Sequence, residues 1–115
     1  MSRRASRGNA VRVDDIASVF SALGDETRLK LVSVLSSGAA KSITELTAGT
    51  GHTRQAVTKH LRVLSSVGLV QDEKSGRERL WKFEPDALKK ARRSLDHIAE
   101  QWDGALERLR RAVEE

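Results

Sequence analysis

The sequence predicts a mainly α-helical fold with one small β-hairpin. Between residues 14 and 68, apolar residues recur every three or four positions in short segments that end at glycines, as in amphipathic helices. After Gly68 the spacing changes to alternation, with Ser75 and Gly76 between two strand-like runs. From Pro85 to the end, the helical spacing returns. A chain of 115 residues with 38% hydrophobic content can form one small domain with a modest core.

Two helices are expected in the first part of the chain. The first begins near Asp14 and stops at Gly24. Its apolar side chains at helical spacing are Ile16, Val19, Phe20 and Leu23. The second has Asp25 as its expected N-cap and ends at Gly38. Its apolar side chains are Leu31, Val32 and Leu35.

The next two helices form a pair. Ser42 stands three residues before Glu45, which is the spacing of a capping box, so a short helix begins there and ends within residues 49–51. A longer helix follows, from near Thr53 to Gly68. A short helix, a glycine-containing turn and a longer helix are typical of a helix-turn-helix.

The two strand-like runs, "LVQDEK" and "RERLWKFE", predict a hairpin with its turn at Ser75 and Gly76. Trp81 and Phe83 fall on one face of the second strand, where we expect them to cap the core. Pro85 suits the first turn of the helix that follows.

The longer helix of the pair has two different faces. At about 100° per residue, Leu61 and Leu64 fall close to Val57 and predict a buried seam. The opposite face carries Gln55, Thr58, Lys59 and Arg62. These side chains are of the types that bond to base edges and phosphates in DNA. With Lys74, Arg77 and Arg79, the hairpin would form a wing along the adjacent DNA backbone, although a solvated turn is the alternative.

The charge is unevenly distributed along the chain. The net charge is +5, and residues 1–13 contain four arginines and no acidic residue. Residues 53–84 carry seven basic and four acidic residues, whereas residues 86–115 are balanced at seven of each. This distribution suits a polyanion at one surface, although a solvated basic tail beside an ordinary charged helix would give it too.

The composition excludes several classes of protein. The chain has no cysteine, which rules out disulfides, thiolate catalysis and thiolate metal sites. It shows no long apolar run and no cleavable leader, so we expect a cytoplasmic protein without a membrane anchor. No nucleophile stands beside a base and no carboxylates converge, so an enzyme is not expected.

Three segments together resemble the ArsR family of bacterial winged helix-turn-helix repressors. They are "VFSALGDETRLKLVSVLSSG", "SITELTAGTGHTRQAVTKHLRVLSSVGLV" and "SGRERLWKFEPDALKKA", and the resemblance covers Ile16 to Ala91. It implies a homodimeric transcriptional regulator whose fourth helix enters the major groove of an inverted-repeat operator. The DNA contacts that it implies are Thr53, Arg54, Gln55, Thr58, Lys59 and Arg62, with Arg77 and Arg79 on the wing.

The sequence departs from the metal-sensing members of this family. Where some carry a Cys-x-Cys type motif in the third helix, this chain reads "ITELTAG". The terminal helix offers Asp96, His97, Glu100 and Asp103. Because Asp96 and His97 are adjacent, they point about 100° apart, so we expect no metal site and no cofactor. Whether an effector exists is not evident from the sequence.

Two further histidines lie close to the expected DNA surface. His52 precedes the fourth helix, where it would either touch a phosphate or fill the turn. His60 projects about 60° from Val57 on the helical wheel, which predicts a half-buried, hydrogen-bonded side chain. The family resemblance keeps a DNA backbone contact open for His60.

The terminal helix predicts self-association. Its apolar residues alternate in steps of three and four over nearly thirty residues, too long to be covered by so small a domain. The residues that we expect in a dimer seam, formed with the first helix, are Leu88, Leu95, Ile98, Trp102 and Leu109. The alternative is packing of its first half within the chain.

The predicted organisation is therefore a flexible basic arm over residues 1–13, a winged helix-turn-helix domain over residues 14–84 and a dimerisation helix over residues 85–115. The predicted function is that of a DNA-binding transcriptional regulator, most simply a repressor. The competing prediction is a winged-helix module that binds proteins without sequence-specific DNA binding. Such a module should show apolar residues on the outward face of the fourth helix.

Overall fold

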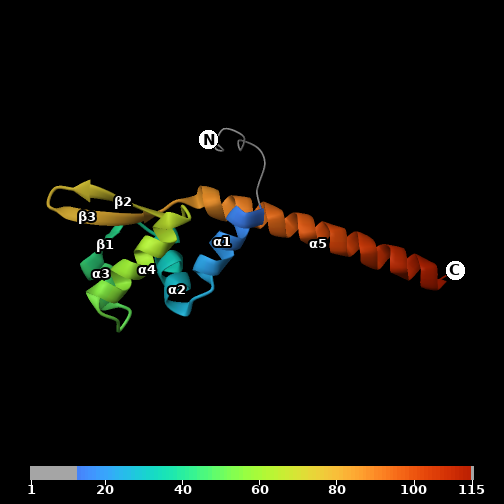
Figure 1. Ribbon diagram of the computed structural model, residues 1–115, viewed down its shortest axis with the longest axis horizontal. Helices are drawn as coiled ribbons and strands as arrows, with labels where there is room; N and C mark the ends of the chain where they lie inside the picture. The colour runs from blue at the N-terminus through green and yellow to red at the C-terminus, as the bar shows by residue number, and fades with distance from the viewer. Residues whose placement is uncertain (1–12, 115) are drawn as a thin grey trace.

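The structure, a computed structural model, describes residues 13–114. The helices are α1 (Val13–Leu23), α2 (Glu26–Ser36), α3 (Ile43–Ala48), α4 (Arg54–Ser66) and α5 (Pro85–Glu114), and the strands are β1 (Lys41–Ser42), β2 (Val70–Ser75) and β3 (Glu78–Phe83). The predicted basic arm lies outside the described residues, except for Val13, which begins α1. Figure 1 shows the first four helices beside the hairpin, with α5 leaving the domain as a long rod.

The predicted helix starts are confirmed by their capping hydrogen bonds. At α2, the Asp25 carboxylate accepts the backbone N–H of Arg28 at 3.0 Å. At α3, the Ser42 N–H donates to Glu45 Oε1 at 2.9 Å and the Glu45 N–H donates to Ser42 Oγ at 3.2 Å, which completes the capping box. Each cap pairs a backbone N–H that the first turn of a helix would otherwise leave without a partner.

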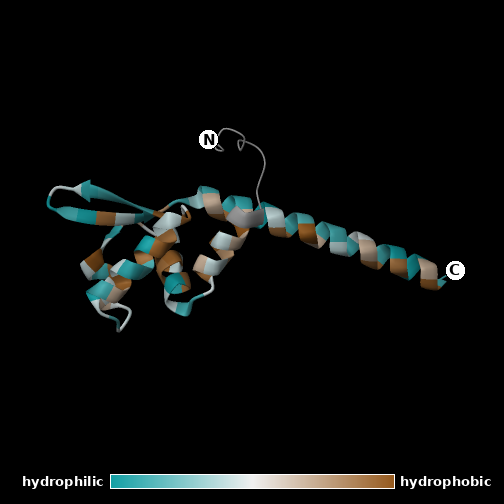
Figure 2. Cartoon of the chain, viewed as in Figure 1, coloured by the Kyte–Doolittle hydropathy of each residue, from teal (hydrophilic) through white to brown (hydrophobic). Residues whose placement is uncertain are grey.

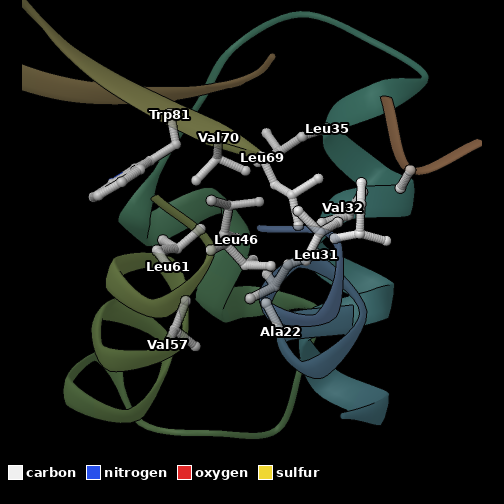
Figure 3. Packing of buried hydrophobic residues seen from close by; sticks show 14 residues of the cluster. Ala22, Leu31, Val32, Leu35, Leu46, Val57, Leu61, Leu69, Val70 and Trp81 are labelled. Carbon is white, nitrogen blue, oxygen red and sulfur yellow. The ribbon is translucent and has the colours of Figure 1, made fainter. Parts of the chain in front are cut away.

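The core lies between the helices and one face of the sheet (Figure 3). Val57, Leu61 and Leu64 of α4 are 0% exposed, which confirms the predicted seam. Trp81 is 5% exposed and belongs to the same cluster, and Phe83 packs against it. Both aromatic side chains of β3 therefore cap the core, as the alternation predicted.

The sheet differs from the prediction in two details. Ser75 pairs with Glu78, so the turn consists of Gly76 and Arg77 and lies one residue later than expected. Gly76 has φ +64° whereas Arg77 has a negative φ, which is the backbone pattern of a type II′ turn with glycine first. The second difference is a third strand, β1, which pairs antiparallel with β3 and makes the order β1-β3-β2.

Only the beginning of α5 packs against the domain. Ala91 is buried, Ala87 and Leu88 are partly buried against the core, and α1 lies alongside. Beyond them the helix continues alone, and its 30 residues span about 45 Å at 1.5 Å per residue. Its exposed large apolar side chains are Leu95, Ile98, Trp102, Leu106, Leu109 and Val113. Figure 2 shows brown, hydrophobic positions recurring along the rod.

No helix within residues 13–114 combines the length and the apolar character needed to cross a bilayer.

The two caps predict part of the acid sensitivity of the fold. The hydrogen bond from the Arg28 N–H lowers the pKa of Asp25, and that from the Ser42 N–H lowers the pKa of Glu45. A lowered pKa stabilises the fold while the group is ionised. This contribution is therefore complete above the ordinary values of about 4 and is lost as the pH falls through the folded-state pKa.

The Asp25→Asn variant tests this contribution because asparagine is as good an N-cap and does not titrate. We expect urea midpoints measured at decreasing pH to fall less steeply for this variant than for the wild type. Identical slopes for the two proteins would contradict the assignment.

Candidate nucleic-acid interface

The outward face of α4 brings the predicted contact residues together. A shallow depression on this face is lined by Arg54, Gln55, Thr58, Lys59 and Arg62. All are exposed apart from the half-buried Thr58. The surface therefore combines three positive charges with amide and hydroxyl groups and contains no carboxylate. Such a set can bond to phosphates and to base edges.

The beginning of α4 adds to this positive character. Thr53 is the N-cap and accepts the Ala56 N–H at 3.1 Å, and the first turn contains no acidic residue. Other N–H groups of the first turn point outward, and the helix dipole gives this end a partial positive charge. Because no side chain of the first turn cancels it, this end of α4 is suited to an anion.

One arginine of this face is held in place by the neighbouring helix. Arg54 donates from Nη1 to the Thr44 hydroxyl of α3 at 2.8 Å. A guanidinium has five N–H donors, so several remain for a ligand. Thr44 was not predicted, although its place at the start of α3 is evident once the two helices are known to be adjacent.

The hairpin carries the three other predicted cations. Arg77 lies in the turn itself, and Lys74 stands directly opposite Arg79 on one face. Like charges in this position destabilise a hairpin. An ion pair between Arg79 and Asp72 offsets part of the repulsion. The alternation along β2 puts Asp72 and Lys74 on the same face, a signal from which this ion pair could have been predicted.

The histidines occupy different environments. His60 is half-buried, with 23% of its side chain exposed, as the helical wheel predicted. Its Nδ1 lies 3.3 Å from Nη1 of Arg28, a partner that was not predicted. Nε2 of the His52 ring lies 3.1 Å from the Thr27 hydroxyl. The backbone N–H of His52 donates to the Thr50 hydroxyl. These contacts support the turn-filling interpretation of His52. His97 is exposed on α5.

The acidic and histidine side chains of α5 lie along an exposed part of the helix. They are Asp96, His97, Glu100 and Asp103. Within residues 13–114, no three histidine, aspartate or glutamate side chains are grouped so that they could hold a metal ion.

A second concavity of about 400 Å³ lies between α2 and α3. Leu31, Val34 and Leu46 contribute its apolar part. Among the charged lining groups, Lys30 pairs with Glu26 at 3.2 Å, and Lys41 lies near Glu45 and helps to lower the pKa of that carboxyl. The charges of this cleft are largely balanced within the chain, in contrast to the outward face of α4.

Comparisons with known proteins agree with a helix-turn-helix formed by α3 and α4. A helix-turn-helix domain model matches residues 23–73. The uncharacterized HTH-type transcriptional regulator YuzN of Bacillus subtilis is 37% identical over 78 residues, which cover 63% of this chain and 85% of the relative. The HTH-type transcriptional regulator Rv2034 of Mycobacterium tuberculosis is 34% identical over 87 residues, with 76% and 78% coverage.

Among solved structures, an ArsR-like transcriptional regulator from Rhodococcus sp. RHA1 superposes with a TM-score of 0.76. It is 37% identical, and the alignment covers 85% of this chain and 92% of that one.

Proposed function

Because the chain belongs to the ArsR-like family of winged helix-turn-helix transcriptional regulators, we propose that it is a repressor that binds an inverted-repeat operator as a homodimer. Gene repression by a protein of this kind follows from occupancy of the operator. This role calls for a surface that reads DNA and for an interface that joins two copies. It calls for no catalytic group, and it places the protein in the cytoplasm with the chromosome.

The outward face of α4 is the observation that carries this proposal. Its three cations, glutamine and threonine lie on one exposed surface of a helix whose other face is locked into the core. A module that binds proteins would instead be expected to place apolar side chains there. Cations and amides on a rigid helix fit the major groove, where arginine forks onto guanine and glutamine onto adenine.

The wing supplies a second argument. Lys74 and Arg79 stand opposite each other although their charges repel, and Arg77 lies at the tip. A phosphate between these side chains would relieve the repulsion. We therefore assign the three residues to contacts with the DNA backbone beside the groove that α4 occupies.

The exposed apolar side chains of α5 support the homodimer. They lie on a single stripe of a helix that extends beyond its own domain, and a second copy of the chain would cover them. A solved Mycobacterium bovis relative, 24% identical with a TM-score of 0.60, is described as a homodimeric winged helix-turn-helix domain. We assign residues 14–84 to DNA binding and residues 85–115 to dimerisation. Leu88 contributes mainly within its own chain because it packs against the core.

The outward face of α4 and the wing are expected to divide the recognition of DNA. Gln55 lies in the first turn of α4, the part of a recognition helix that reaches the base edges, whereas Arg77 lies on the wing. We expect Gln55→Ala to change the preferred half-site. Arg77→Ala should keep the preference and flatten the salt dependence by about 0.9 for each phosphate that the protein no longer binds.

Binding-site selection from random DNA with both variants, repeated at two salt concentrations, measures these effects. The opposite pattern, in which Arg77→Ala changes the selected sequence and Gln55→Ala weakens all sites equally, would show that α4 does not read the groove.

DNA affinity is expected to be independent of transition metals. The chain has no cysteine, and the acidic and histidine side chains of α5 are not grouped as metal ligands. Titrations with zinc and with a chelator should therefore give the same dissociation constant. A tenfold difference, about 1.4 kcal/mol, would contradict the expectation.

A further inference from the structure

Arg28 joins three helices through one side chain. Its Nε donates to the Ala22 carbonyl at 2.6 Å and its Nη2 to the Ser21 carbonyl at 3.5 Å, both near the end of α1. Its Nη1 lies 3.3 Å from Nδ1 of His60, in the middle of α4. The backbone N–H of Arg28 donates to the carboxylate of Asp25, the N-cap of α2. Arg28 therefore connects the end of α1 to the recognition helix.

The chemistry of the contact assigns a role to each partner. A guanidinium has donors only, so a hydrogen bond between Arg28 Nη1 and His60 Nδ1 requires Nδ1 to accept, as it does in the tautomer protonated on Nε2. Asp25 and His52 also face this ring. Asp25 Oδ2 lies 3.9 Å from Nδ1, and the His52 ring lies 6.3 Å away, edge to face.

We propose that Arg28 and His60 are positioning residues for DNA binding, and that protonation of His60 releases the link between α1 and α4. This inference rests on the proposed function, since α4 is its recognition helix. The buried anchorage of α4 is apolar and non-directional, through Val57, Leu61 and Leu64. The exposed Arg54–Thr44 hydrogen bond ties the start of α4 to α3. The Arg28–His60 hydrogen bond adds a directional constraint on the same helix.

The link also reaches the proposed dimer interface. α1 packs along α5, and the Ala22 carbonyl lies in the last turn of α1, where a helix leaves its carbonyls without partners within the helix. The Arg28 guanidinium donates to this carbonyl, and a cation at the end of a helix interacts favourably with the helix dipole. A change in how α1 packs against α5 or against a second copy would therefore be transmitted to α4 through one guanidinium.

Protonation of His60 would turn its attractive contact with Arg28 into a repulsive one. A proton on Nδ1 removes the acceptor and places two cations 3.3 Å apart, so Arg28 is repelled. The imidazolium then turns its Nδ1–H toward the Asp25 carboxylate, 3.9 Å away. A comparison of DNA affinity at high and low pH therefore tests this exchange of partners.

The test compares the wild type with two variants of the full-length protein. Glutamine at position 60 can accept from Arg28 but cannot titrate, so His60→Gln is the matched control. Lysine at position 28 keeps the charge but cannot donate to Ala22 and His60 together. The measurements are DNA affinity at about pH 8 and about pH 5, the limits of histidine titration, and dimer dissociation by sedimentation.

As the pH is lowered from about 8 to about 5, we expect the DNA affinity of the wild type to fall by about tenfold more than that of His60→Gln. This difference is equivalent to about 1.4 kcal/mol. His60→Gln should match the wild type at the higher pH. Arg28→Lys should bind DNA more weakly at both pH values while its dimer dissociation constant stays unchanged. Parallel pH profiles for the wild type and His60→Gln, or full affinity in Arg28→Lys, would overturn the proposal.

A second readout requires no DNA. The nitrogen chemical shifts of His60 should show an unprotonated Nδ1 in the wild type near pH 8, and the α4 amide signals should move in Arg28→Lys. A protonated Nδ1, or unchanged α4 signals, would overturn the positioning role even if the wild type failed to bind any DNA. Absence of DNA binding with these signals as expected would overturn the proposed function alone.

Discussion

The Trp102→Glu variant is expected to be a monomer at micromolar concentration and to lose most of its affinity for an inverted-repeat operator. Trp102 is 63% exposed at the centre of the α5 stripe, between Ile98 and Leu106. A carboxylate in a helix seam would be buried without a partner, and tryptophan is the residue type that most often dominates an interface. We expect a loss of at least about 2 kcal/mol in dimerisation.

Gln101→Glu is the matched control. It makes the same kind of charge change at the neighbouring position, about 100° around the helix and away from the stripe. Sedimentation should show Gln101→Glu as a dimer and Trp102→Glu as a monomer. A dimeric Trp102→Glu protein would show that the stripe on α5 is not the interface.

The second large effect is expected from Leu61→Ala. Leu61 is 0% exposed and lies on the face of α4 that packs into the core (Figure 3). Removal of a leucine side chain from such a position costs about 2 to 5 kcal/mol, because apolar burial is reduced and a cavity remains. Small domains are stable by only about 5 to 15 kcal/mol, so the variant should unfold at a much lower urea concentration.

The adjacent residue provides the contrast. Arg62 is exposed on the outward face, so Arg62→Ala should change stability by less than about 0.5 kcal/mol and yet weaken DNA binding. Urea unfolding and DNA titration of both variants measure the two effects separately. A destabilised Arg62→Ala protein, or a Leu61→Ala protein of wild-type stability, would contradict the assignment of the two faces of α4.

Much of the fold could be predicted because its determinants are local. The N-caps at Asp25 and Ser42 are set by residues three positions away, and the faces of α4 follow from helical spacing. What could not be predicted depends on contacts between distant segments. β1 is only two residues long and exists because it pairs with Leu80 and Trp81 of β3. Its sequence has no alternation long enough to be recognised.

The candidate site shows the same division. Gln55, Thr58, Lys59 and Arg62 were found from their spacing on one helix, and the structure brings them onto one surface. Arg28 was not singled out because its partners are the end of α1 and a residue 32 positions away on α4. The one-residue shift of the turn instead concealed the placement of Lys74 directly opposite Arg79, because the predicted turn would have put Asp72 there.

The most direct test of DNA recognition by α4 and the wing is the affinity for DNA from upstream of the gene, measured against a scrambled fragment over a range of salt concentrations. Each protomer offers six predicted contact cations, three on α4 and three on the wing. If half of them contact phosphates, the logarithm of the binding constant should fall with the logarithm of salt concentration with a slope of about −5 for a dimer. We predict this slope together with a preference for the upstream fragment that persists as salt rises. Failure to retain either fragment at low salt would contradict DNA recognition and favour a protein-binding module.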